Sequence, residues 1–558
     1  MSSAPAQAPA AAGPRKRPNH GGNGNSDSNN NNSRWIKNKK KTKREKNITE
    51  CSSEDVLRND IEALLRSRQE QQPEDAETAP ESLPEEGTEM EVEVLDLSST
   101  GDGLAMPRGS RAPHVYVVPF TVPGDTVRVK VFRHVAREKH SVADFLAVAA
   151  PSPLRDDARI QCRYFARCGG CQFQMLDYPE QLKLKKRVFE KAYRNFSNLA
   201  AELVPPVQDT IGSPLQYGYR TKLTPHFDGP PGSMSRKNRG TARFDKCPDI
   251  GFMLKGSRRV MDIEECPIGT EAVNLGMTRE RERMQHEYPN YKRGATLLLR
   301  ENTKRHPKDS PDAPAGELPP YTAKTETDAF TDVKTCETVS KTITTEYIGN
   351  YIFQNPAGSF FQNNNSILPV FTSYIRDHIL PPSGDTKIKY LIDAYSGSGL
   401  FTITLSSVFQ RSIGIDISAD SIAFARSNAT LNGLGEDRCT FIAADAGELF
   451  KSVKYDADET VVVLDPPRKG CDGDFLQQLR RFGPRRIVYV SCNVHTQARD
   501  VGVLVRGEGE GRRYEIESLR GFDFFPQTGH VEGVAILNRV EQVPETATDD
   551  GSVPEASG

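Results

Sequence analysis

The chain has 558 residues and ten cysteines, and its formal net charge is only −2. This length predicts three or four domains with sizeable cores. The sequence shows neither a secretory apolar segment nor a run of about 18 apolar residues, which argues against a disulfide-stapled secreted protein and a membrane protein, so we expect a soluble intracellular one.

The first 85 residues have the composition of a disordered tail. Residues 34–46 form a basic block and residues 70–93 an acidic one, while one short amphipathic helix is compatible with residues 55–65. The basic block suits a nucleic-acid contact, a nuclear address or a merely solvated tail. We expect the protein in the cytoplasm, the nucleus or both; the basic residues 15–17 lack the amphipathic pattern that would favour a mitochondrial presequence.

Residues 86–152 carry short runs in which apolar and polar residues alternate, such as EVEVLDL, HVYVVPF and DTVRVKVFR. Several short strands separated by turn residues predict a small OB-like β-barrel. Basic residues, including Lys130 and Arg133, would allow such a barrel to bind nucleic acid. On this stretch alone, a plain packing module is the simpler interpretation.

Residues 153–347 are expected to form a central mixed α+β domain that opens with a cysteine cluster. The cysteines follow the pattern C-x5-C-G-G-C and are joined later by a Cys-Pro pair, which gives the set Cys162, Cys168, Cys171 and Cys266. Cys247, which is also followed by proline, competes for the fourth place. Thiolates at this spacing suit an iron–sulfur cluster or zinc, and four thiols without metal are the third interpretation.

From residue 348 to residue 543, apolar strand-like runs alternate with amphipathic helical patterns, and the tail at 544–558 is acidic and expected to be disordered. This rhythm is typical of an α/β fold with a doubly wound, Rossmann-like sheet. Ligands of such sheets bind outside the carboxyl ends of the strands. The residues at these ends therefore indicate the chemistry of the domain.

Three successive strands are expected to end in acidic residues. The first leads into Asp393-Ala-Tyr395-Ser-Gly397-Ser-Gly, where glycines allow a ligand to approach the backbone closely. The second and third end at Asp416 and Asp445, which suit a ribose diol and an adenine edge. Because no phosphate-cradling GK[ST] motif is present, this pattern favours S-adenosylmethionine over a nucleotide phosphate. Each Asp taken singly would also serve as a helix cap.

Two further strand ends carry an acid and a thiol. Asp465 follows the apolar run VVVL and precedes two prolines, and Cys492 ends the run IVYVS. Both side chains should face one crevice, where they suggest attack on an electrophile beside a bound cofactor. A structural Asp and a buried Cys are the alternative. Nearby, Arg468 suits either a phosphate or a pairing with Asp465.

These motifs resemble the RNA (uracil-5-)-methyltransferase family over about residues 90–540. The resemblance rests on DPPRKG at 465–470, on YVSCNVHT at 489–496 and on FPQTGHVE at 525–532. The sequence FFQNN at 360–364 is similar to the family's cofactor-contacting FxQxN segment. The family's LYCGNGNF reads AYSGSGLF here, so its glycines remain while its Cys and both Asn are replaced. The predicted barrel resembles a TRAM domain.

The resemblance implies transfer of a methyl group from S-adenosylmethionine to C5 of a uridine in RNA. C5 of uracil is too weak a nucleophile for direct attack; a thiolate added at C6 makes it enolate-like, and a base must then remove the C5 proton. Cys492 is the implied nucleophile and Glu532 the implied base. The implied cofactor-binding residues are Gln362, Tyr395, Gly397, Asp416, Asp445 and Asp465. Asp465 also suits the uracil edge.

The resemblance also implies a cluster, a substrate and a partner. The family's ribosomal-RNA members carry a [4Fe–4S] cluster on four cysteines that match Cys162, Cys168, Cys171 and Cys266. Because methyl transfer requires no electrons, a structural role is expected for it. The Asn-rich basic tail is typical of eukaryotic proteins, for which the family implies the T-loop uridine 54 of tRNA. Ribosomal RNA is the nearest rival, and an RNA-binding chaperone with secondary methylation is the alternative from another class. No obligate protein partner is evident.

Contacts to RNA are expected from basic residues of the central region. A basic helix covers Lys183 to Arg194, and a second segment contains Tyr219, Arg220 and Lys222. Unpaired bases are commonly stacked on aromatic rings while Arg and Lys contact phosphates. A charged helix face is more often simply solvated, so these assignments are hypotheses.

Overall fold

The computed structural model describes residues 48–70, 82–233, 241–311, 316–382, 387–444, 450 and 453–541. Residues 1–48 and 49–558 form two separate units, and the helices and strands of the fold belong to the second. The basic block, the tail at 544–558 and Asp445 lie outside the described residues. Among the described helices, none combines the length and the apolar character needed to cross a membrane.

Part of the region predicted as a disordered tail is a helix. Helix α1 spans Ser53–Glu70, so the disorder prediction is wrong for these residues. The amphipathic pattern, which indicated a helix over residues 55–65, underestimates its length. Ile61 and Leu65 pack against apolar barrel residues. The buried carboxylate of Asp60 accepts a hydrogen bond from the amide of Ser99 at 2.6 Å. Tertiary contacts therefore stabilise a segment whose surroundings in the sequence have the composition of a tail.

The predicted β-barrel is present as a closed barrel with the strand order β1-β2-β3-β5-β4. Its strands are β1 Glu89–Leu97, β2 Gly103–Met106, β3 Val115–Val118, β4 Thr126–Val135 and β5 His140–Ala150. The valines of β4 point into the barrel core. Its outward-facing Arg128 and Lys130 lie opposite Glu91 and Glu89 of β1. This part of the barrel surface therefore carries both signs of charge.

Most of the central region is mixed α+β, as predicted. It contains helix α3 and small sheets with the orders β10-β9-β8-β11 and β13-β14-β12-β7, followed by the hairpin β15–β16. The bounds are β7 Lys222–Leu223, β8 His226–Phe227, β9 Gly251–Met253, β10 Val260–Asp262, α3 Glu271–Glu287, β11 Ala295–Thr296, β12 Leu299–Pro307, β13 Ala323–Glu326, β14 Phe330–Glu337, β15 Ile343–Ile348 and β16 Tyr351–Pro356.

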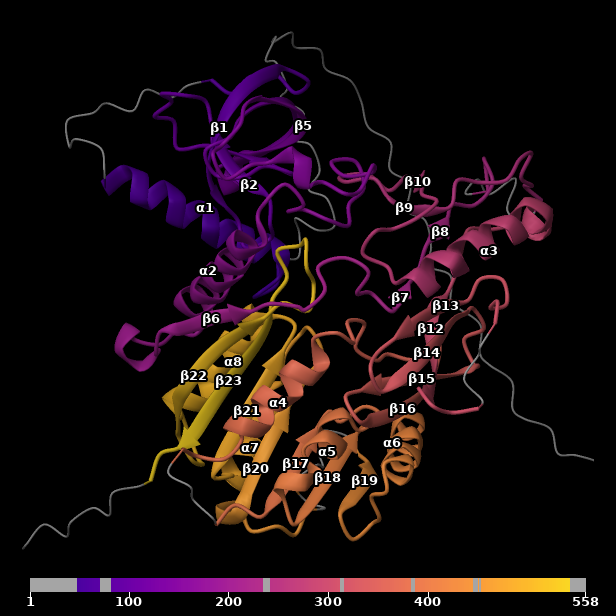
Figure 1. The fold of residues 1–558 in the computed structure, drawn as a ribbon. Coiled ribbons are helices and arrows are strands. Elements are labelled where there is room, and N and C mark those ends of the chain that lie inside the picture. The colour runs from indigo at the N-terminus through magenta and orange to yellow at the C-terminus, as the bar shows by residue number, and fades with distance from the viewer. Residues whose placement is uncertain are drawn as a thin grey trace, which may run out of the picture. The chain divides into compact units, whose positions relative to one another are not determined.

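The doubly wound sheet predicted for residues 348–543 is confirmed. Figure 1 shows its strands, in the order β19-β18-β17-β20-β21-β23-β22-β6. They span β6 Val207–Ile211, β17 Tyr390–Ala394, β18 Arg411–Asp416, β19 Cys439–Ala443, β20 Thr460–Leu464, β21 Arg486–Ser491, β22 Tyr514–Phe522 and β23 Glu532–Arg539. Strands β17 to β21 are parallel, and β23 runs antiparallel between β21 and β22. All five residues of β20 are buried, as expected for a parallel strand covered on both faces.

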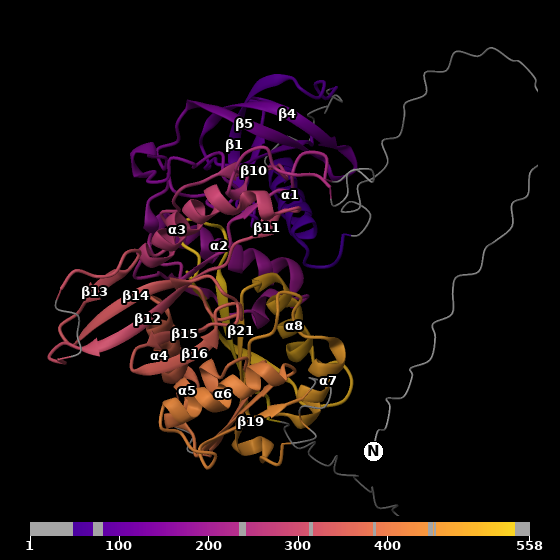
Figure 2. The same ribbon diagram turned by 90° about the vertical axis from the view of Figure 1, so that its right-hand side faces the viewer.

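Helices cover both faces of this sheet (Figure 2). They are α2 Tyr178–Phe196, α4 Leu368–His378, α5 Leu400–Thr404, α6 Ala419–Leu431, α7 Gly473–Phe482 and α8 Val494–Arg506. Val462 and Leu464 of β20 enter a core shared with α2, α7 and α8. Their neighbours Val461 and Val463 enter a second core shared with α4, α5 and α6. This alternation follows from the two-residue period of a strand.

Two elements of the predicted central domain belong to the large sheet and to the helices that cover it. Strand β6 pairs in parallel with β22 and forms the edge of the large sheet. Helix α2 packs against α8 and buries Phe189 and Tyr193 in the first core. The boundary expected near residue 347 therefore does not separate the large sheet from everything that precedes it.

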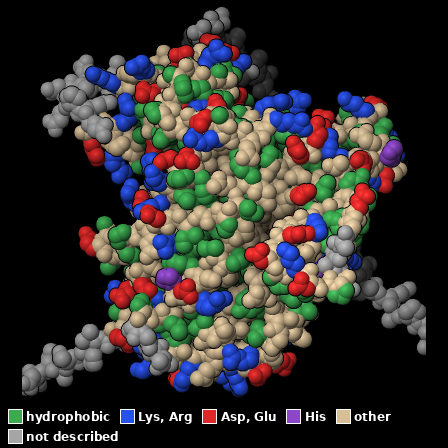
Figure 3. All heavy atoms as spheres, viewed as in Figure 1, with side chains coloured by type: hydrophobic (Ala, Val, Ile, Leu, Met, Phe, Trp, Pro, Cys, Tyr) green, Lys and Arg blue, Asp and Glu red, His purple; other side chains and the backbone are tan. Residues whose placement is uncertain are grey.

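The basic residues of α2 are largely paired with acids, in contrast to the predicted RNA-binding face. The pairs are Lys183–Glu180, Lys185–Asp523, Lys186–Asp209, Arg187–Asp96 and Lys191–Asp96. On the face shown in Figure 3, basic and acidic side chains are likewise interspersed. Local neutralisation of this kind reduces the attraction of α2 for phosphates, and the RNA contact of this helix stays a prediction.

A buried ion pair of the central region fixes the end of the FFQNN segment. Arg300 in β12 pairs with Glu346 in β15, and both side chains are 2% exposed. Arg300 also donates to Asn363 Oδ1 at 2.9 Å, and Asn365 donates to Glu346 Oε2 at 2.7 Å. The pair therefore holds Asn363 and Asn365, the two residues on either side of Asn364 at the end of this segment.

Replacing Arg300 by Met should lower the free energy of unfolding by about 3–5 kcal/mol, because Glu346 would remain buried without its counter-charge. Urea unfolding followed by circular dichroism measures this loss. R300M/E346L should recover most of it, and Arg163→Met, which removes an exposed pair with Glu264, should change little. An R300M protein as stable as the wild type would contradict the assigned role.

Candidate active site

Two strand ends bring Cys492 and Glu532 together at the carboxyl edge of the parallel strands. Strands β21 and β23 pair antiparallel with Ser491 opposite Gly533. Continuing this register by one residue sets Cys492 opposite Glu532, at a Cα separation of about 4.5–5.5 Å. Asp465 ends the adjacent parallel strand β20, and its carboxyl acts on the pKa of both residues. The structure thus brings together Asp465 and Cys492, which the sequence predicted to share a crevice, and adds Glu532, the base implied by the family resemblance.

The thiol of Cys492 lies beside both negatively and positively charged side chains. Its pKa is raised to about 11, mainly by burial and then by the carboxyls of Glu532 and Asp465. Arg468 lowers it through its positive charge and a hydrogen bond. Asn493 caps helix α8, so the positive end of the helix dipole also lies close to the thiol. The thiolate therefore depends on Arg468, for which the sequence suggested a phosphate or Asp465 as partner.

The loop that carries Arg468 is fastened to the start of α8. The carbonyl oxygen of Arg468 accepts hydrogen bonds from Asn493 Nδ2 at 3.0 Å and from Thr496 Oγ1 at 3.3 Å. Gly470 has φ +77°, and a Cβ at this position would lie 2.6 Å from a carboxylate oxygen of Asp500. The DPPRKG loop and the nucleophile are thereby held as one unit.

Glu532 is a buried carboxyl group with a high proton affinity. Its side chain is 2% exposed, and burial together with Asp465 raises its pKa well above the ordinary value, against the effect of Arg468. Its Oε2 atom is buried and has no hydrogen-bond partner among the described residues. A carboxyl in these surroundings is suited to accept a proton from a ligand.

A second pair of carboxyls lies deeper in the same site. Asp393 is fully buried and accepts hydrogen bonds from Thr402 N at 2.8 Å and Thr402 Oγ1 at 2.6 Å. Burial raises the pKa of both Asp393 and Asp465 to about 7, with a further increase for Asp465 from the charge of Asp393. The sequence predicted Asp393 only as an acidic strand end. The signal that could have indicated a role in the site is an acid inside the apolar run YLIDA. With Glu532, these groups form a cluster of interacting carboxyls that favours a cationic ligand.

The glycine turn after β17 is fixed by the end of β18. Asp416 accepts hydrogen bonds from Gly397 N at 3.0 Å and from Ser418 N at 2.8 Å. Each carboxylate oxygen keeps a second lone pair, which suits a ribose hydroxyl. Tyr395 adopts φ +66°, and its ring packs against Phe475. The Tyr395 ring thus packs toward α7, while its backbone lies in the glycine turn.

Gln362 lies in a segment whose neighbours are all anchored. Asn363 and Asn365 bond the Arg300–Glu346 pair, and Asn364 donates to Phe524 O at 3.2 Å. The Gln362 side chain is half-buried. The residues that follow Gln362 thus hold the backbone on its C-terminal side.

The four cysteines predicted as a ligand set line one cavity of about 370 Å³. Burial, with the charges of the other three thiols, raises the pKa of Cys171 to about 12. Cys247 lies elsewhere, with its thiol 3.7 Å from Met284 O, so Cys266 is the fourth member. In the described part of the chain, no three His, Cys, Asp or Glu side chains are grouped to hold a metal ion. Arg468 and His530 line the same cavity, which therefore extends to the DPPRKG loop and to the segment before Glu532.

The segment predicted to contact RNA mainly supports the structure. Tyr219 is 2% exposed and donates to Pro526 O at 3.1 Å, so its ring is not available for stacking, and that prediction is wrong. Lys222 donates to the carbonyls of Gly358 and Ser359 at 3.1 and 3.0 Å, which leaves it little freedom to contact phosphate. Arg220 lines the cysteine cavity and remains a candidate.

The pH dependence of Cys492 reactivity should report the charge of Arg468. Alkylation of Cys492 by iodoacetamide should speed up about tenfold per pH unit below its pKa, because only the thiolate reacts. Arg468→Met removes a positive charge that lowers the pKa of Cys492, so its curve should shift to higher pH. Mass spectrometry of the peptide containing Cys492 measures the rate. Lys469→Met, a substitution of an exposed neighbour, is the control. An unchanged or lower midpoint in R468M would refute this electrostatic role.

Comparisons with known proteins agree with this geometry. Residues 337–540 match the family model described as tRNA (Uracil-5-)-methyltransferase. The tRNA (uracil(54)-C(5))-methyltransferase of Schizosaccharomyces pombe is 45% identical over 90% of this chain and 86% of its own length. The enzyme of the same name from Saccharomyces cerevisiae is 43% identical over 80% and 73% of the respective chains.

A solved structure shares the fold. It is the tRNA (uracil-54, C5)-methyltransferase of Pyrococcus abyssi in complex with S-adenosyl-L-homocysteine, which is 24% identical in sequence and has a TM-score of 0.54. The match covers 80% of this chain and 100% of that one. The extent of the sequence identity to the two fungal proteins decides the assignment: the chain belongs to the tRNA (uracil-5-)-methyltransferase family.

Proposed function

We propose that the protein transfers a methyl group from S-adenosylmethionine to C5 of uridine 54 in the T loop of tRNA. The observation that carries this proposal is the pairing of β21 with β23, which sets a thiol opposite a high-pKa carboxyl beside further carboxyls. The names of the two fungal relatives support tRNA as the substrate and position 54 as the target.

The residues divide the reaction between them. The thiolate of Cys492, stabilised by Arg468, adds to C6 of the uracil and forms a C–S bond, which makes C5 nucleophilic. The cofactor supplies an electrophilic methyl group, which C5 takes up. Glu532 then removes the C5 proton, the C6–S bond breaks, and the thiolate is regenerated. The proton finally resides on Glu532, whose burial favours the protonated form.

The residues present fit the cofactor. We assign the ribose diol to Asp416, and the sulfonium region to the carboxyls of Asp393 and Asp465. A buried pair of carboxyls with raised pKa values gains stability when a positive charge is brought near it. Gln362 and the glycine turn at Gly397 complete the site with an amide and an accessible backbone.

RNA binding is assigned to the barrel, as a TRAM-type module, and to Arg220. The strand order β1-β2-β3-β5-β4 supports an OB-like barrel, a fold that commonly binds nucleic acids. The target uracil must leave its stack to meet Cys492, which favours a loop substrate. Arg220 and Arg468 line the same cavity and offer positive charge at the entrance of the site.

We further propose that the cysteine cavity holds a [4Fe–4S] cluster on Cys162, Cys168, Cys171 and Cys266. The four thiols line one cavity, and their spacing in the sequence matches the C-x5-C-x2-C…C-P pattern. Thiolates are the ligands that iron–sulfur clusters prefer. The cluster would join residues 162–171 to the segment between β10 and α3 and stabilise that region.

The decisive test uses a T-loop tRNA transcript in which uridine is replaced by 5-fluorouridine, with radiolabelled S-adenosylmethionine. Fluorine at C5 cannot be removed by a base, so a labelled covalent protein–RNA adduct should accumulate on denaturing gels. Cys492→Ala should abolish the adduct. Glu532→Gln should trap an adduct even with ordinary uridine, because C5 proton removal is lost.

The other outcomes of this test are equally informative. An adduct with ribosomal RNA but none with tRNA would replace the substrate while keeping the chemistry. RNA binding without any adduct would refute the enzymatic proposal and favour an RNA chaperone.

The cluster is tested by metal analysis of protein purified without oxygen. About four iron and four acid-labile sulfide atoms per chain are expected. Cys171→Ser should lose most of the iron, whereas Cys247→Ser, which alters a cysteine outside the cavity, should retain it. Zinc in place of iron, or equal metal content in both variants, would contradict the proposal.

A further inference from the structure

The segment that leads into Glu532 is held by residues far away in the sequence. Residues 523–530 connect β22 to β23 and end two positions before Glu532. The carbonyl oxygen of Gln527 accepts hydrogen bonds from Gln172 N at 2.7 Å and Phe173 N at 3.1 Å. Gln527 N in turn donates to Gln181 Oε1 at 3.1 Å. The loop is therefore positioned by the region around α2.

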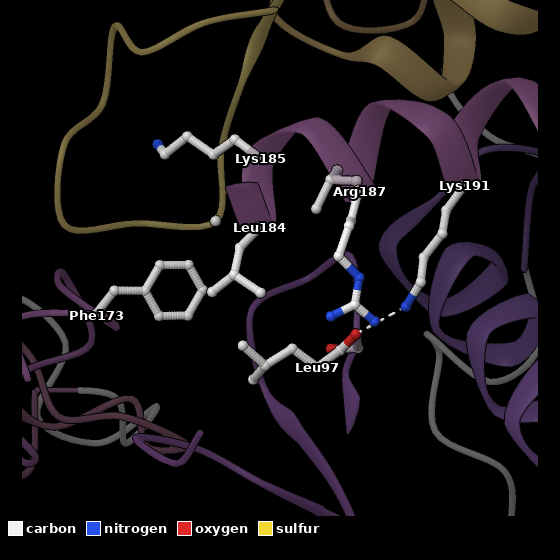
Figure 4. A pocket seen from close by; sticks show the side chains of 9 residues that line it. Leu97, Phe173, Leu184, Lys185, Arg187 and Lys191 are labelled. Atoms are coloured by element: carbon white, nitrogen blue, oxygen red, sulfur yellow. Dashed lines mark hydrogen bonds between the residues drawn. The ribbon is translucent and has the colours of Figure 1, made fainter. Parts of the chain in front are cut away.

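Lys185 of α2 is the charged centre of these contacts. Figure 4 shows its side chain directed from α2 toward this loop. The side chain is fully buried, and Nζ donates to Asp523 Oδ1 at 2.7 Å, Phe525 O at 3.0 Å and His530 O at 2.6 Å. An ammonium group has three protons, so every one is used. Since Phe525 and His530 lie near opposite ends of the loop, one group closes it.

Asp523 is buried as completely as Lys185 and completes this clamp. It accepts hydrogen bonds from Tyr178 OH at 3.0 Å and from Phe525 N at 3.1 Å, in addition to the ammonium of Lys185. Its own amide donates to Ile211 O of β6 at 2.9 Å. Helix α2, strand β6 and the loop thus meet at one buried ion pair.

The side chain of Glu532 has no comparable support. Its Oε2 atom lacks a partner among the described residues, so its placement follows from the backbone of the loop and of β23. The requirement for placement is strict, because a base misplaced by about 1 Å can cost on the order of 100-fold in rate. The carbonyl of His530, held by Lys185, lies two residues before Glu532, and Val531 between them is buried in the core.

We infer that Lys185 is a positioning residue for proton abstraction by Glu532, acting through Asp523 and residues 523–530. The inference rests on the proposed function and deepens it. The sequence predicted that the basic helix α2 contacts RNA. The inference instead gives a lysine of this helix a role in the final step of the reaction. Cys492 is held between β21 and α8 rather than on this loop, so loss of the clamp should affect the two halves of the reaction unequally.

The test is a single-turnover reaction of Lys185→Met with ordinary tRNA that carries tritium at C5 of the target uridine and with labelled S-adenosylmethionine. Methionine keeps the length of the side chain but donates no hydrogen bond. Tritium release should slow about 10- to 100-fold. A methylated covalent adduct, which turns over in the wild type, should build up on denaturing gels, since the adduct forms but the proton leaves slowly.

Three further variants separate positioning from folding. K185M/D523N removes both buried charges, so it should be more stable than K185M in thermal unfolding and should still accumulate the adduct. Lys186→Met removes a neighbouring lysine of α2 whose partner Asp209 is exposed, and should behave as the wild type. Tyr178→Phe removes one donor to Asp523, together with the acceptor of Ser213 N, and should give a smaller defect of the same kind.

Two results would overturn the inference. If tritium release and adduct formation fell together in both Lys185 variants, the residue would serve folding only. If K185M released tritium at the wild-type rate, the clamp would have no role in this step. Failure of the proposed function itself is recognised separately, because the wild type would then give no adduct with 5-fluorouridine tRNA.

Discussion

The active site depends on the register between β21 and β23. Cys492 ends one strand and Glu532 begins the other, forty residues later in the chain, and antiparallel pairing sets them opposite each other. A shift by one residue would move both side chains to other faces of the sheet. The buried runs of both strands prevent such a shift, because each places alternate residues in two different cores. The packing of the sheet therefore fixes the distance between nucleophile and base.

Burial at this edge acts on the nucleophile and the base in opposite ways. It raises the pKa of Glu532, which strengthens the base, and it raises the pKa of Cys492, which disfavours the thiolate. Arg468 counters the second effect with a hydrogen bond and a positive charge, and the start of α8 adds a helix dipole. Because Arg468 also favours the ionised form of Glu532, one cation adjusts both groups. Its backbone is tied to Asn493 and Thr496, so the adjustment is built into the loop.

The sequence predicted the elements of the large sheet and the residues at its strand ends, since both follow from local periodicity and from breakers. It failed where a residue's role depends on a distant partner. Tyr219 is an aromatic residue beside basic ones, as expected of an RNA contact, yet its hydroxyl donates a hydrogen bond to the carbonyl of Pro526. Lys185 belongs to a basic helix, but its partner Asp523 is more than three hundred residues away. Strand β6 is too short and too polar to be assigned to the large sheet before its pairing with β22 is known.

The cysteine cavity and the base-bearing loop form a continuous structure. Cys171 is followed directly by Gln172 and Phe173, whose amides both donate to the carbonyl of Gln527 in the loop. Gln172 also accepts a hydrogen bond from Gly529 N at 2.9 Å, close to His530, which lines the cavity. Any group that orders the four thiols would therefore also order the segment that precedes Glu532. Since methyl transfer involves no change of oxidation state, this mechanical link gives the cysteines a reason to lie beside a site whose chemistry does not require electrons.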